Sequence, residues 1–216
     1  MRCSKPLYAL LLSLLLAGCS QTLQHNTTEP TQQTRSDDEQ ISVQAEGVTA
    51  APNAELTVAQ QKQFAQAKAL LLNGDSKAAT EAFSTLAQEL PSANGIWYNL
   101  AMSQWQNGEV EAAAQTLKQL TTHSPAYSAG HNLAGVLARQ QGRFIDAEQH
   151  FKLALSASPD NANAHKNIAF LYELYLNKPL QAHYHYKQYF ALTGDEQATA
   201  WLALLEQQLA QEQTHD

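Results

Sequence analysis

Histidine and cysteine are the side chains of this 216-residue chain with the widest reactive chemistry, and it has eight histidines and two cysteines. His183 and His185 are two positions apart, and on a helix such residues point to different faces, which disfavours a shared metal. His131 and His165 are expected to make hydrogen-bonded packing contacts. The chain has no phosphate-binding loop and no HExxH, CxxC or GxSxG motif. We therefore predict a protein that is not an enzyme, with no metal site and no cofactor beyond a covalent lipid.

The N-terminal segment has the pattern of a secretory signal. Residues 1–18 begin with basic side chains at Arg2 and Lys5 and continue with a leucine-rich run. That run is about ten residues long, well short of the roughly 20 that cross a bilayer as a helix, which disfavours the alternative of a transmembrane anchor. Cys3 and Cys19 both lie in the first twenty residues, so no disulfide stabilises the rest of the chain.

The stretch Leu16-Ala17-Gly18-Cys19 resembles the signal of bacterial lipoproteins. In that family the cysteine thiol receives a diacylglycerol, the signal is cleaved, and the new amino group is acylated. The resemblance implies lipidation of Cys19, with fatty acyl chains such as palmitate. Ser20, in place of the aspartate that retains such proteins in the inner membrane, implies the outer membrane, periplasmic face.

Residues 19–55 are rich in polar side chains and show no helical or strand period, which predicts a lipidated, disordered tether. The formal net charge of the chain is −7. Because a negative protein repels phosphate backbones, nucleic acid is excluded as a partner.

A repeat with a period of 34 residues organises the rest of the chain. Four kinds of landmark recur at that spacing: Gly74, Gly108 and Gly142; Ala79, Ala113 and Ala147; Phe83, Leu117 and Phe151; Pro91, Pro125 and Pro159. The apolar residues between them follow a helical period, with two helix-length stretches per unit. Glycine allows the left-handed turn between two helices, and proline ends the second helix. We therefore predict an all-α chain of helical hairpins.

These landmarks, with Trp97, Leu100 and Ala101, make the chain similar to the tetratricopeptide repeat (TPR) family. The resemblance implies a right-handed α-solenoid over residues 56–194, with repeats near 60–93, 94–127, 128–161 and 162–195 and a capping helix over 195–212. His131 and His165 replace the family's tryptophan, and Gln104 its tyrosine. In the last repeat Asn177 is expected to take the left-handed place of glycine.

The family resemblance also implies a concave groove lined by the first helix of each repeat. Its expected residues are Tyr98, Asn99, Met102, Trp105, Asn132, Arg139, Lys166, Asn167 and Phe170, with Lys68 at one end and Glu173 as the acidic member. This mainly cationic lining favours an acidic or carboxylate-ended peptide.

Two functions fit this sequence. The first is a protein-interaction scaffold or adaptor that holds a partner for an envelope machine, such as pilus or secretion assembly or a murein hydrolase complex. The alternative is a self-associating structural lipoprotein, in which the terminal helix docks onto another copy.

Overall fold

The computed structural model describes residues 55–213, and all the regular secondary structure in this part of the chain is α-helix. The helices are α2 Val58–Leu72, α3 Ser76–Glu89, α4 Asn94–Gln106, α5 Val110–His123, α6 Ser128–Gln140, α7 Phe144–Ala157, α8 Ala162–Leu174, α9 Pro179–Thr193 and α10 Gln197–Gln213. The all-α prediction of stacked helical hairpins is confirmed. The predicted signal peptide, the lipidation site Cys19 and nearly all of the tether lie outside the described residues.

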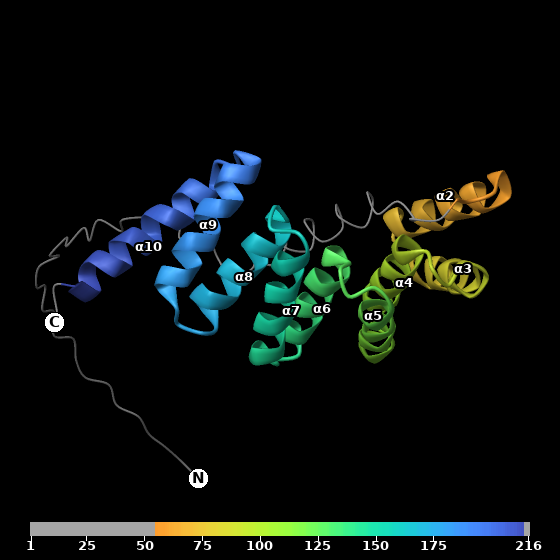
Figure 1. The fold of residues 1–216 in the computed structure, drawn as a ribbon, viewed down its shortest axis with the longest axis horizontal. Helices are drawn as coiled ribbons and strands as arrows, with labels where there is room; N and C mark the ends of the chain where they lie inside the picture. The colour runs from red at the N-terminus through yellow and green to blue at the C-terminus, as the bar shows by residue number, and fades with distance from the viewer. Residues whose placement is uncertain (1–54, 214–216) are drawn as a thin grey trace, which may run out of the picture.

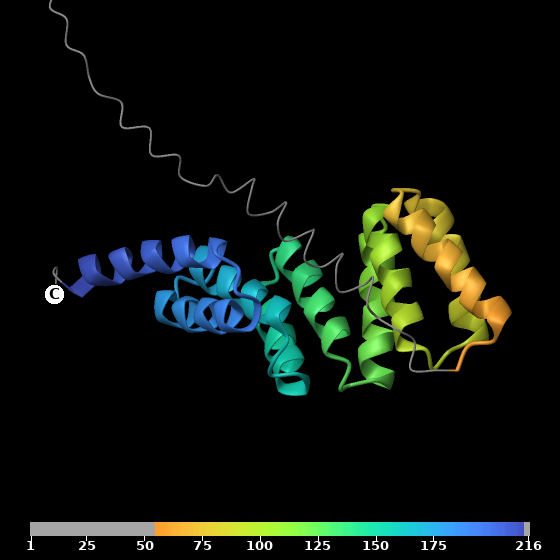
Figure 2. The same cartoon turned by 90° about the horizontal axis from the view of Figure 1, so that it is seen from above.

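The helices pack in sequential pairs, α2 with α3, α4 with α5, α6 with α7 and α8 with α9. These hairpins follow one another along the long axis of the molecule, from α2 at one end to α10 at the other (Figures 1 and 2). None of the helices within residues 55–213 combines the length and the apolar character needed to cross a bilayer.

Turns with a left-handed residue join the helices of each pair. Gly74, Gly108 and Gly142 have φ between 72° and 82°, and Asn177 takes the same region with φ 49°. The prediction for Asn177 is confirmed; an Asn side chain is among the few that tolerate this conformation. In the last hairpin Pro179 begins α9, where its missing N–H is not needed.

The core lies between the two helices of each hairpin and between neighbouring hairpins. The recurrent Ala79, Ala113 and Ala147 are fully buried, as are the large apolar residues four positions after each alanine. On each of these second helices a small buried side chain is followed one turn later by a large one, which allows close packing against the partner helix.

Helix α10 closes the stack on α9. Trp201 is 4 % exposed and lies 5.2 Å from the ring centroids of both Phe170 and Tyr186. At the start of α10, the Asp195 carboxylate accepts a hydrogen bond from the backbone N–H of Gln197. This helix covers the apolar face that the last repeat of a solenoid would otherwise expose.

Candidate functional site

Three apolar residues of the predicted groove lie in the core. Tyr98, Met102 and Phe170 are each at most 1 % exposed. Tyr98 makes an edge contact with Tyr127, which directly precedes α6, and Phe170 makes one with Trp201 of α10. These side chains pack between neighbouring helices, so little of their surface is available to a partner.

The asparagines of the predicted groove are also buried. The Asn167 side-chain amide donates to the side-chain oxygen Oδ1 of Asn132 over 2.9 Å, joining α8 to α6. The Asn99 amide donates to the backbone carbonyl of Gly95 over 2.6 Å. These bonds fix side chains that would be costly to bury without a partner.

Arg139 and Lys166, the two cations in the central part of the predicted groove, lie over aromatic rings. The Lys166 ammonium is 5.5 Å from the centroid of the Tyr189 ring, and the Arg139 guanidinium is 5.8 Å from that of Tyr175. Both side chains are buried. Attraction between a cation and a ring face partly replaces the water that burial removes.

The outer members of the predicted groove make local contacts of their own. Lys68 lies over the Phe64 ring, and the Glu173 carboxylate accepts a hydrogen bond from the Tyr186 hydroxyl. Trp105 is the one residue of the nine that is not buried, and its ring N–H donates to Gln140 of the next repeat over 2.9 Å. A partner entering the predicted groove would therefore meet mainly Trp105 and the tips of the other side chains.

His131 and His165 perform the structural task of the tryptophan they replace. In the second repeat the Trp97 ring N–H donates to the carbonyl oxygen of Pro91 over 2.9 Å. The Nε2 atoms of His131 and His165 make the same contact with Pro125 and Pro159, both over 3.0 Å. Because a carbonyl only accepts, Nε2 carries the proton in both neutral rings.

Each of these histidines lies beside a second histidine from the other helix of its hairpin. His165 Nδ1 is 2.9 Å from His185 Nδ1, and the His131 and His150 ring centroids are 5.9 Å apart. Burial lowers the pKa of all four rings, that of His185 to about 4, and the neighbouring ring further lowers the pKa of His150 and His185. All four are therefore neutral at pH 7.

Acid is expected to destabilise the fold through these pairs. A histidine in the unfolded chain has a pKa near 6.5, whereas the pKa of these four rings is lower in the folded protein. Their stabilisation is thus complete above about pH 6.5 and is lost as the pH falls toward 4, the folded pKa of His185. We expect Tm to fall by a few degrees between pH 7.5 and pH 5. Thermal unfolding of His185→Gln should show a smaller fall, and an equal fall would contradict this assignment.

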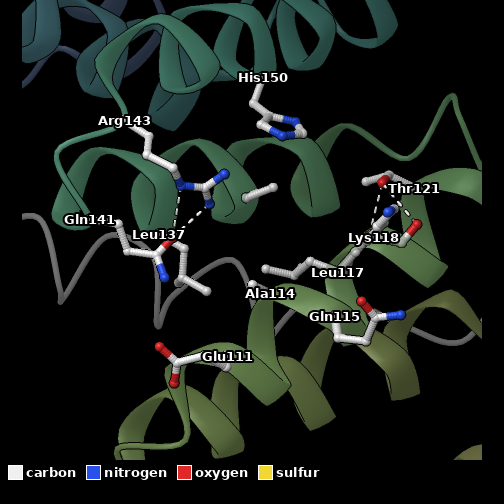
Figure 3. A pocket seen from close by; sticks show the side chains of 11 residues that line it. Glu111, Ala114, Gln115, Leu117, Lys118, Thr121, Leu137, Gln141, Arg143 and His150 are labelled. Carbon is white, nitrogen blue, oxygen red and sulfur yellow. Dashed lines mark hydrogen bonds between the residues drawn. The ribbon is translucent and has the colours of Figure 1, made fainter.

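A pocket of about 670 Å³ lies between α5 and the hairpin of α6 and α7 (Figure 3). Its floor is apolar and its rim is polar. The lining residues are Glu111, Ala114, Gln115, Leu117, Lys118, Thr121, Ala134, Leu137, Gln141, Arg143 and His150. A cavity with an apolar floor and a few polar groups is the usual form of a binding site. None of these residues belongs to the predicted groove.

The rim of the pocket carries two cations on different hairpins. Lys118 comes from α5, and Arg143 precedes α7. Arg143 donates to the Gln141 side chain from Nε and one terminal nitrogen, and to Asp146 from the other. An Arg side chain has five N–H groups, so two remain for a further acceptor. The lining residues carry one more positive than negative charge, because Glu111 is acidic and His150 is neutral, and Asp146 beside the pocket pairs with Arg143 over 3.1 Å.

Sequence comparison points to one family. Residues 64–128 and 98–162 each match the tetratricopeptide repeat family. No curated protein sequence matches the chain.

Solved structures share its fold. The crystal structure of TTC0263, a thermophilic TPR protein of Thermus thermophilus, is 24 % identical with a TM-score of 0.58, over 69 % of this chain and 82 % of the other. MamA from Desulfovibrio magneticus RS-1 is 15 % identical with a TM-score of 0.54, over 63 % and 77 %. PilF of Pseudomonas aeruginosa is 16 % identical with a TM-score of 0.60, over 81 % and 71 %. At these identities the likeness establishes the fold.

Proposed function

We propose that this chain, a tetratricopeptide repeat protein over residues 64–162, is an adaptor lipoprotein that holds a partner protein at the periplasmic face of the bacterial outer membrane. The observation that carries the proposal is the pocket between α5 and the α6–α7 hairpin. Stacked helical repeats create extended surfaces that bind other proteins.

The anchor half of the proposal rests on Leu16-Ala17-Gly18-Cys19 and on the polar segment that follows. Several acyl chains hold a protein to a membrane far more firmly than one does. A flexible tether of about 35 residues spans roughly 30 Å, which lets the helical stack reach partners beneath the membrane. Machines for pilus or secretion assembly and murein hydrolase complexes offer such partners. PilF, whose fold the chain shares, supports a comparison at the level of architecture.

In-cell cross-linking tests both halves. A photo-cross-linking amino acid at position 115, an exposed site in the pocket lining, should yield an adduct with a distinct partner protein. The matched control carries the same amino acid at position 81, an exposed site on α3, and should not yield that adduct. Cys19→Ser should move the protein from the membrane to the soluble fraction and weaken the adduct.

Three outcomes would contradict the proposal. Identical adducts from positions 115 and 81 would show that the pocket binds the partner no more specifically than another exposed surface of the chain does. Cys19→Ser protein that stays in the membrane fraction would remove the lipid anchor. An adduct with twice the mass of this chain would instead support self-association.

A further inference from the structure

The next repeat shows how this chain itself fills a site equivalent to the pocket. Helices α5 and α7 are aligned by 34 residues, so Ala114 corresponds to Glu148 and Lys118 to Lys152. The extra residue in the last turn makes Arg143 correspond to Lys178, and both precede their helices directly. The backbone agrees, because Arg143 N–H donates to the Ala138 carbonyl and Lys178 N–H to the Tyr172 carbonyl, both over 2.8 Å.

In that next repeat a carboxylate bridges the two hairpins. Glu148 accepts hydrogen bonds from Lys152 over 2.7 Å, from the Tyr172 hydroxyl over 3.0 Å and from Lys178 over 3.3 Å. Burial alone would raise the pKa of Glu148, but these bonds outweigh it and lower that pKa. The site is therefore built to hold an ionised carboxylate.

The pocket keeps the cations of this arrangement but not its acidic and aromatic members. Alanine stands at positions 114 and 138, where the next repeat has Glu148 and Tyr172. In that repeat the Tyr172 ring stacks on His185, with centroids 5.7 Å apart. The counterpart of His185 is His150, which lines the pocket and points into it (Figure 3).

We propose that the pocket binds a segment of a partner protein that inserts a Glu or Asp side chain between Lys118 and Arg143 and an aromatic side chain against His150. The inference rests on the proposed adaptor function and names the chemistry of its partner. Glu148 occupies the equivalent site in the next repeat and indicates that the ligand group is a side-chain carboxylate. Charge complementarity with the cationic rim supports the same choice.

A carboxylate introduced at position 114 of this chain tests the pocket without any partner protein. Ala114→Glu should raise Tm of the full chain by about 2–4 °C relative to Ala114→Gln. Part of that rise could come from Lys118, four residues along the same helix. Arg143 belongs to the other hairpin, so Arg143→Gln should remove most of the gain. A gain that is unchanged by Arg143→Gln, or no gain at all, would overturn the proposal.

Peptide binding to the full chain tests the ligand class. The probes are two fluorescein-labelled decapeptides of Gly and Ser with blocked ends, one with a central Glu-Tyr pair and one with Gln-Tyr. One charge-assisted pair should make the Glu peptide bind about tenfold more tightly. Ala114→Glu and Lys118→Gln should each remove that preference. Equal binding of the two peptides, or no binding of the Glu peptide, would overturn the inference, while an adduct from position 115 would still support the adaptor function.

Discussion

Trp201→Ala is expected to lower the free energy of unfolding by about 3–5 kcal/mol, the usual cost of truncating a buried tryptophan. The ring is 4 % exposed and lies between two helices of the last repeat and α10. Its contacts with Phe170 of α8 and with Tyr186 and Tyr189 of α9 hold the capping helix on the stack. Chemical denaturation followed by far-ultraviolet circular dichroism would measure the loss.

A matched control lies on the same helix. Leu204 is 44 % exposed, so Leu204→Ala removes less buried area and should cost well under 1 kcal/mol. Equal losses for the two variants would contradict the role assigned to Trp201. Because Trp201 packs within its own chain, any change of oligomeric state in Trp201→Ala would follow from partial unfolding of the cap.

The fold could be predicted from sequence because each landmark obeys a local rule. Gly108 takes a left-handed turn and Ala113 faces a neighbouring helix whatever lies elsewhere in the chain. Asn177 follows the same logic, since among side chains asparagine tolerates that turn well. A period of 34 residues repeats these rules and so fixes the order of the helices.

The candidate site depends on packing between repeats, which a single helix does not reveal. Met102 and Phe170 lie on the expected helices, yet neighbouring helices bury them almost completely. The pocket arises where Ala114 replaces the equivalent of Glu148. A comparison of the aligned repeats reveals that difference, but its meaning depends on knowing that the Glu148 carboxylate reaches Tyr172 and Lys178 of the next hairpin.

Phe151→Ala is expected to lower the free energy of unfolding by about 3–5 kcal/mol. Energetic coupling to position 135 should distinguish Phe151 from other core residues. The Phe151 ring is fully buried against Gly135 of α6. A Cβ atom at position 135 would lie 2.5 Å from the nearest ring carbon, too close for any ordered structure. The absence of a side chain at Gly135 therefore leaves the room that the Phe151 ring occupies.

That fit predicts a strong coupling between the two positions. Gly135→Ala alone should cost about 1–3 kcal/mol through overpacking, reduced by up to about 1 kcal/mol because alanine favours the helix. In the Phe151→Leu background, Gly135→Ala should leave the free energy of unfolding unchanged or raise it. The preceding repeat has Ala101 and Leu117 at the equivalent positions and buries both. Denaturant unfolding of the two single variants and the double variant gives the coupling energy directly. Additive losses would mean that the ring can move away from position 135 without cost, and the close fit between α6 and α7 would then contribute nothing to the stability of the third repeat.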